Sequence, residues 1–243
     1  MLLRTEGIVL RTAEYGEADL IVTHLTLEYG ILKTFAKSPR KTKSRFGSSL
    51  EPLTHAVISF WGKEESSLPR LTQSDIIHPF SGLRGSFRCF LKIAELLEMT
   101  LSVLPEREPA RAVFRLLLGT MRRMEQDCDG AMALLCYKVK LLDAAGFLPG
   151  MKKCGRCGSS GTEFHFGHGT VLCAACSEGK GHSLTVSPGG MNLFRNLVEW
   201  DLEKVGRIRP SEGQIEELSA MLAEHLRYVT DRRPQATGWS GSP

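Results

Sequence analysis

The first third of the chain alternates apolar and polar residues with a period of two, as strands that bury one face do. In the segment EGIVLRTA, for example, Ile8 and Leu10 fall on the same face. Similar runs follow, separated by glycine, proline, serine and charged clusters. The expected strands lie in residues 6–13, 19–30, 31–37, 54–62 and 68–78. Five short strands in about 80 residues favour a small closed barrel, most economically an OB-fold, although an SH3-like barrel fits the same pattern.

After residue 80 the apolar positions change to the spacing of one helical face. A first helix is expected over 86–104, where Phe90 and Ile93 share a face. Further helices are expected over 110–126 and 130–145.

Two capping signals predict helices in the last quarter of the chain. Ser187 before Pro188 is typical of an N-cap followed by proline in the first turn. Ser211 with Gln214 forms a capping-box pattern at the start of a long apolar stripe.

The expected fold class is therefore α+β, with a five-stranded OB-fold barrel followed by an all-helical domain that carries an inserted zinc ribbon with four cysteine ligands. The expected parts are the barrel (1–80), the helical domain (81–150 and 182–232), the metal-binding insertion (151–181) and a flexible tail (233–243).

The strongest chemical signal is two CxxC pairs, Cys154 with Cys157 and Cys173 with Cys176, separated by fifteen residues. Two such pairs surround Zn²⁺ with four thiolates in zinc ribbons, whereas two disulfides or four unliganded thiols are the alternatives. A glycine-rich segment without a metal would have little to hold it folded. The sequence predicts one structural Zn²⁺, because four cysteines leave no coordination position for a catalytic water.

Other cysteines and histidines are expected to be structural or surface residues. Seven cysteines, an odd number, and no signal peptide fit a reducing compartment. Three cysteines in apolar helical patterns are expected to be small core residues: Cys89, Cys128 and Cys136. Three histidines near the CxxC pairs could substitute as a metal ligand, but with four cysteines available they are expected to be exposed loop residues: His165, His168 and His182.

Composition and charge narrow the class of protein. The 243 residues are 42% hydrophobic and 24% charged, which is ordinary for a globular protein. Neither a membrane span nor a signal peptide is expected, because the longest apolar run is about seven residues and charges interrupt the N-terminal segment. A soluble, intracellular protein is the expectation. The net charge of +4 belongs to one segment, since without the six cations of residues 33–45 the balance is 25 − 27 = −2.

This basic segment is the candidate site for a polyanion. It contains Lys33, Lys37, Arg40, Lys41, Lys43 and Arg45, directly followed by Phe46. Lysine and arginine bind phosphates without sequence preference, and a local cluster on a nearly neutral chain favours this role over a merely solvated loop. Aromatic residues on neighbouring strands could stack on unpaired bases, although each also fits the core: Tyr15, Phe35, Phe60 and Trp61.

A second set of cations lies on the expected helices: Arg111, Arg115, Arg122, Arg123, Lys138 and Lys140. Between apolar faces these residues could receive an acidic, hydrophobic peptide, although exposed charge on an amphipathic helix is the simpler interpretation. The sequence contains no Gly-rich phosphate loop, nucleophile elbow or metalloprotease motif, and its acids form no convincing acid/base pair. It therefore indicates a binding protein rather than an enzyme.

The order of these features resembles the RecO family of bacterial DNA repair proteins. The resemblance runs through most of the chain and includes EGIVLRTAEYGEADLIVTHLTLEYG, KSPRKTKSRFGSSLEPLTHAVISF, LLDAAGFLP and CGRCG…LCAAC. It implies an N-terminal OB-fold, a helical domain and a zinc-binding insertion. It also implies a cytoplasmic, nucleoid-associated recombination mediator.

The resemblance further implies binding of single- and double-stranded DNA, annealing of complementary strands, and contact with the acidic C-terminal tail of single-stranded DNA-binding protein (SSB). RecR would be a partner in loading RecA onto SSB-coated strands. The KSPRKTKSRF segment would contact phosphates, with Phe46 stacking on a base or anchoring the loop, and the helical domain would hold the SSB tail, with Lys138 and Lys140 as candidate contacts. The alternative is a zinc-ribbon RNA-binding or transcription accessory protein, which would prefer RNA and ignore SSB.

Overall fold

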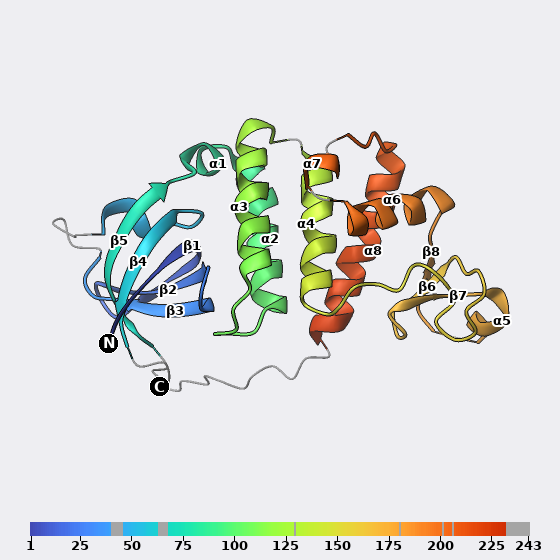
Figure 1. Ribbon diagram of the computed structural model, residues 1–243, viewed down its shortest axis with the longest axis horizontal. Helices are drawn as coiled ribbons and strands as arrows, with labels where there is room; N and C mark the ends of the chain where they lie inside the picture. The colour runs from blue at the N-terminus through green and yellow to red at the C-terminus, as the bar shows by residue number, and fades with distance from the viewer. Residues whose placement is uncertain are drawn as a thin grey trace. The chain divides into compact units, whose positions relative to one another are not determined.

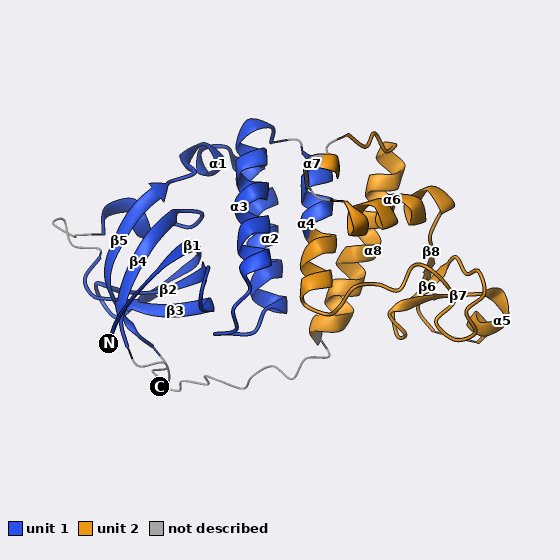
Figure 2. Ribbon diagram, viewed as in Figure 1, with its two compact units in different colours: residues 1–137 blue, residues 138–243 orange. Residues whose placement is uncertain are grey.

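The computed structural model describes residues 1–39, 46–62, 68–128, 130–179, 181–200, 202–205 and 207–231. The chain divides into two compact units, residues 1–137 and 138–243 (Figure 2). The division falls within helix α4 (Ala131–Ala144), whereas the sequence placed a domain boundary at residue 80. The difference arises because the helices that follow the barrel pack against it.

The first unit contains a closed barrel of five strands (Figure 1). The strands are β1 (Leu2–Tyr15), β2 (Asp19–Thr26), β3 (Gly30–Ala36), β4 (His55–Trp61) and β5 (Arg70–His78), with a short 3-10 helix, η1 (Gly47–Leu50), before β4. The strands close in the order β1-β2-β3-β5-β4, with β3 and β5 parallel and the other pairs antiparallel. The predicted OB-fold is confirmed.

The barrel interior is filled from alternate positions of the strands. Val9, Val22 and Leu71 belong to the interior cluster, and each is fully buried. Ile8 and Leu10, the two positions marked by the sequence pattern, are not part of this interior cluster and are buried too. Both faces of β1 are therefore covered, because helix α2 (Phe87–Val103) packs on its outer side.

Two more helices belong to this unit, α1 (Ser81–Gly85) and α3 (Arg111–Gln126). The helices predicted over 86–104, 110–126 and 130–145 are confirmed as α2, α3 and α4 to within a residue at each end. Side chains connect α2 and α3 to the strands: Arg11 pairs with Glu98, and the ring of His55 lies 5.9 Å from that of Phe114.

The chain after α2 also touches the barrel through its backbone. Glu106 forms a bridge with Ile31, and the amide of Arg107 donates to the Ile31 carbonyl at 2.9 Å. At Gly30, which has a φ of +60°, a Cβ atom would stand 1.8 Å from the Glu108 carbonyl oxygen. Only glycine fits there, since any side chain would collide with backbone.

The expectation of three free core cysteines is wrong for two of them. Cys89 and Cys128 form a disulfide, with 2.01 Å between the sulfurs and 5.5 Å between the Cα atoms. The two residues are 39 positions apart, and the helical period of each segment does not show that the start of α2 and the end of α3 meet. Cys136 is buried and takes no part in a disulfide, as predicted.

The second unit combines helices with a small sheet (Figure 1). The sheet has the order β7-β6-β8, from β6 (Glu163–His165), β7 (Thr170–Leu172) and β8 (Ser183–Thr185). The helices are α5 (Ala174–Ser177), α6 (Pro188–Glu199), α7 (Leu202–Val205) and α8 (Glu212–Asp231). Both predicted caps are confirmed: the Ser187 hydroxyl accepts from the Gly190 amide at 3.0 Å, and Ser211 and Gln214 bond reciprocally.

Aromatic side chains join the small sheet to α8. Phe164 and Phe166 are buried, and the Phe164 ring lies 5.5 Å from that of His225. His225 also bonds to the Phe147 carbonyl at 2.8 Å. Within the described part of the chain, no helix combines the length and apolar character needed to cross a bilayer.

A buried histidine makes the first unit sensitive to acid. His24 is fully buried in the barrel, and burial lowers its pKa to about 4, only partly offset by the nearby backbone of Leu32 and Val22. The unfolded chain binds this proton near pH 6.5, so stability is lost as the pH falls from about 6.5 towards 4. We expect His24 to account for about 2 kcal/mol of lost stability between about pH 7 and pH 5.

Urea unfolding at the two pH values, followed by Trp61 fluorescence in a variant with the other two tryptophans replaced by phenylalanine, measures this loss. His24→Leu is the control: it keeps an apolar side chain of similar size and removes the titrating group. Burial lowers the pKa of His55 as well, so part of the acid effect should persist in that variant. An equal loss in His24→Leu and its parent would contradict the assignment.

Candidate metal centre and nucleic-acid interface

The four cysteines of the two CxxC pairs meet in the second unit. The sulfurs of Cys154, Cys157, Cys173 and Cys176 all lie within 4.8 Å of one another, and those of Cys157 and Cys173 are 3.6 Å apart. A tetrahedron with Zn–S bonds of about 2.3 Å has edges of about 3.8 Å. The sulfur positions therefore fit one tetrahedral metal ion.

The backbone around the first pair is fixed by the small sheet. The Cys154 amide donates to the Ser159 carbonyl at 2.8 Å, and the Gly155 amide donates to the Val171 carbonyl at 3.0 Å. Gly155 lies so close to β7 that a Cβ atom there would be 2.3 Å from the Thr170 methyl group. The glycine after the first cysteine thus lets the loop dock on β7 and present Cys154 to the other sulfurs.

The electrostatics of the cluster also suit a cation. The amide of Cys157 is the main cause that lowers the pKa of Cys154 to about 6, which favours its thiolate. The neighbouring sulfurs of Cys157 and Cys173 raise the pKa of Cys176 to about 12, because another negative charge beside them is unfavourable. A dication at the centre removes that repulsion and allows four thiolates. The donor set, four sulfurs, fits zinc.

The three nearby histidines are not members of this cluster. His168 and His182 are exposed, as predicted, and the His182 ring stacks on Phe166 at 4.8 Å. His165 was expected to be exposed and is instead buried on β6, 3.6 Å from Glu163. The error has a simple cause: the sequence between the CxxC pairs looked like a loop, whereas it forms two strands.

Only some of the predicted DNA-binding residues belong to the part of the chain that the structure describes. Arg40, Lys41, Lys43 and Arg45 lie outside the residues that the structure describes. Lys33 is exposed on β3 but paired with Glu106, and Lys37 is exposed directly after β3. The Ser38 amide donates to the Asp19 carboxylate at 2.6 Å, which fixes the chain where it leaves the barrel and enters the basic segment.

Phe46 is a core residue, so its assignment as a base-stacking residue is not supported. Its side chain is 3% exposed and belongs to the barrel's interior cluster, where it anchors the end of the basic segment. Phe60 is buried in the same cluster. The sequence had left both roles open for Phe46, and only the closed barrel distinguishes them.

Other aromatic residues do reach the surface, in a row across the barrel. The register places Phe35 beside Arg70, and Arg70 beside Trp61. The next row inwards, Ala36, Leu71 and Phe60, fills the interior, so the first row points outwards. Trp61 is 57% exposed, and Tyr15, which is 45% exposed, contacts the Phe35 ring edge-on at 5.8 Å. We call Tyr15, Phe35, Arg70 and Trp61 the outer aromatic row.

The position of this row suits a single strand. Tyr15 is the last residue of β1 and pairs with Asp19 of β2. Because the Asp19 carboxylate accepts a hydrogen bond from the Ser38 amide, the basic segment begins beside the row. Trp61 and Arg70 flank the β4–β5 connection. OB-folds bind oligonucleotides with this kind of surface, next to the β1–β2 and β4–β5 loops. The sequence pattern gives no sign of Arg70, because only the parallel pairing of β3 with β5 brings it into the row.

Two family models match this chain, "Recombination protein O N terminal" over residues 1–80 and "Recombination protein O C terminal" over residues 93–237. A DNA repair protein RecO from Thermodesulfovibrio yellowstonii is 43% identical over 231 residues, which cover 93% of this chain and 92% of the relative. One from a Nocardioides species is 39% identical over 96% of both chains, and one from Thermobifida fusca is 33% identical over 93% of both.

The chain belongs to the RecO family. Its role is therefore in DNA repair and recombination, and the resemblance drawn from the sequence is confirmed. The match supports a DNA-binding protein over the RNA-binding alternative.

The two lysines predicted to contact an SSB tail are poorly placed for it in this RecO family member. Lys138 is only 9% exposed on α4. The Lys140 ammonium donates to the Val198 carbonyl at the end of α6. Reversing either charge would therefore disturb the packing of the second unit.

Proposed function

We propose that this RecO family member is a recombination mediator without enzymatic activity. It binds single- and double-stranded DNA, anneals complementary strands and works with RecR to load RecA onto strands coated with SSB, whose acidic tail it contacts. One structural Zn²⁺, held by Cys154, Cys157, Cys173 and Cys176, stabilises the second unit. This activity belongs to the cytoplasm, at the nucleoid.

The outer aromatic row beside the basic segment carries the proposal. Exposed aromatic rings stack on unpaired bases of any sequence, and cations neutralise the phosphates that follow them. Trp61 and Tyr15 offer the rings, Arg70 lies between Phe35 and Trp61, and Lys37 begins the cationic segment. This combination binds a strand without reading its sequence, as a protein that anneals any two complementary strands must.

Annealing follows from charge neutralisation. Two strands repel each other through their phosphates, and a protein that neutralises both in one complex lowers this repulsion and raises their local concentration. The chain contributes no reacting group to this process. Its residues bind and orient the strands, and base pairing supplies the free energy.

An annealing assay on SSB-coated strands tests the proposal. Complementary strands carrying a fluorophore and a quencher are coated with cognate SSB and mixed with or without the protein. We expect faster quenching with the protein, and loss of this acceleration when the SSB tail is deleted, because the tail recruits the protein to the coated strand.

The same assay on naked strands is the control. Acceleration on naked strands alone would leave a basic annealing protein and remove the SSB contact from the proposal. No acceleration on either substrate, with the metal bound and the fold intact, would contradict the proposed function.

A further inference from the structure

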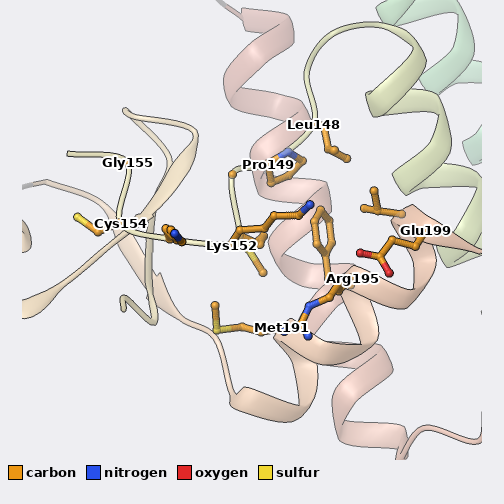
Figure 3. A pocket seen from close by; sticks show the side chains of 13 residues that line it. Leu148, Pro149, Lys152, Cys154, Gly155, Met191, Arg195 and Glu199 are labelled. Carbon is orange, nitrogen blue, oxygen red and sulfur yellow. The ribbon is translucent and has the colours of Figure 1, made fainter. Parts of the chain in front are cut away.

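The second unit has a pocket of about 530 Å³ between helix α6 and the chain that enters the first CxxC pair (Figure 3). Besides Gly150 and Cys154, the buried and half-buried part of its lining is apolar and consists of Leu148, Pro149, Met151, Met191, Phe194 and Val198. The charged residues of the lining are exposed: Lys152, Lys153, Arg195 and Glu199. Three cations thus face one carboxylate around an apolar depression.

This combination favours a particular class of ligand. An apolar depression of this size accepts one or two hydrophobic side chains, and surplus positive charge at its rim attracts acidic residues next to them. Figure 3 shows Lys152 extending over the pocket from the CxxC side, with Arg195 and Glu199 on the α6 side. A nucleic-acid backbone would use the cations but leave the apolar lining without a partner. An acidic peptide with an apolar end satisfies both.

One wall of the pocket belongs to the metal centre. Cys154 and Gly155 line the pocket, and Cys154 is also one of the four clustered cysteines. The segment between Gly150 and Gly155 is tied to β7 at both ends: the Gly150 carbonyl accepts from the Val171 amide at 2.8 Å, and the Gly155 amide donates to the Val171 carbonyl at 3.0 Å. Loss of the metal would free the Cys154 side chain, and the segment that forms this wall would no longer be held in place.

We propose that this pocket binds an acidic peptide with an apolar end, and that the first CxxC pair forms the wall that makes this binding depend on bound metal. The proposal rests on the proposed function, in which the SSB tail is the acidic partner. It replaces Lys138 and Lys140 with Lys152, Lys153 and Arg195 as the cations of the peptide site. Two lysines immediately before a CxxC pair were the signal in the sequence.

Fluorescence anisotropy with a labelled synthetic peptide, the C-terminal segment of cognate SSB, measures binding to the full chain. Arg195→Glu reverses a rim charge and Met191→Glu places an anion in the apolar lining; both lie on α6, outside the segment that carries the four cysteines. We expect each to weaken peptide binding by about tenfold or more. Arg207→Glu reverses an exposed charge of the same unit outside the pocket and should change affinity less than about twofold.

The dependence on metal is tested with the full chain in zinc-loaded and chelator-treated form. Removing zinc should weaken peptide binding at least about tenfold while leaving the affinity for DNA, a property of the first unit, unchanged. Because coupling between two ligands is reciprocal, saturating peptide should raise zinc affinity by the same factor. Competition with a chromophoric chelator, with and without peptide, measures that factor.

The outcomes separate this proposal from the proposed function. Unchanged peptide affinity in Arg195→Glu and Met191→Glu would place the peptide elsewhere, and unchanged affinity without zinc would remove the coupling. In either case normal annealing of SSB-coated strands would leave the proposed function standing. If annealing failed while peptide binding stayed intact, the proposed function would be overturned, but the pocket would still be the peptide-binding site.

Discussion

Cys154→Ser is expected to abolish stable zinc binding and to unfold the segment between residues 150 and 186. Structural zinc contributes on the order of 10–16 kcal/mol to small domains of this kind, and three thiolates with one hydroxyl bind it far less tightly. Apart from the few side chains that it buries, such as Phe164 against α8, the segment has little else to hold it, since its three strands have three residues each. The zinc content measured by elemental analysis should fall from about one ion per chain towards none. Limited proteolysis should cut within the segment.

Cys136→Ser is the matched control, because it makes the same chemical change at a buried thiol of α4 outside the sulfur cluster. It should retain the metal. Full retention of zinc by Cys154→Ser would refute the ligand set, and equal loss in both variants would indicate that metal content reports general unfolding.

Replacing Lys37, Arg40, Lys41 and Lys43 with alanine is expected to weaken single-strand binding by about 100-fold or more at low salt. Each phosphate contact contributes about 0.7 to the slope of log affinity against log salt for single strands, so four lost contacts flatten the slope by up to about 2.8. The measurement is fluorescence anisotropy of a labelled oligonucleotide over a series of salt concentrations. The slope separates lost phosphate contacts from a general loss of folded protein.

Two controls sharpen this result. Replacing the four arginines of α3 with alanine removes the same charge from another surface and should leave the slope nearly unchanged: Arg111, Arg115, Arg122 and Arg123. Trp61→Ala removes a stacking surface without removing charge, so it should weaken binding by about 1–3 kcal/mol at an unaltered slope. If the α3 set carries the slope, the DNA lies on the helices and not on the barrel.

Much of this fold could be predicted because short stretches of the sequence are enough to indicate its helices and strands. Strands and helices differ in the period of their apolar residues, and the caps at Ser187 and Ser211 are side-chain hydrogen bonds made within four residues. The CxxC pairs are equally local, because each already contains the turn that aims two sulfurs at one ion. These predictions needed no knowledge of which segments meet.

Apart from His165, whose strand the sequence did not reveal, the residues that the sequence misplaced or missed lie where segments distant along the chain meet. Phe46 follows a run of cations and looked accessible, but closure of the barrel leaves its ring in the interior. Cys89 and Cys128 looked like separate core residues until α2 and α3 brought them together. Arg70 was overlooked because its neighbours in the outer aromatic row come from strands whose pairing only the barrel determines.

The close backbone contact at Gly30 limits which fragments of this protein can fold independently. A fragment ending at residue 80 would contain every strand of the barrel, yet it would lack the Glu106 bridge to Ile31 and the helix that covers the outer side of β1. Ile8 and Leu10 would then meet water, at a cost of about 1.5–3 kcal/mol for each side chain exposed. The smallest piece able to fold independently and bind DNA should therefore extend through α3, and a shorter one should aggregate through its uncovered strand.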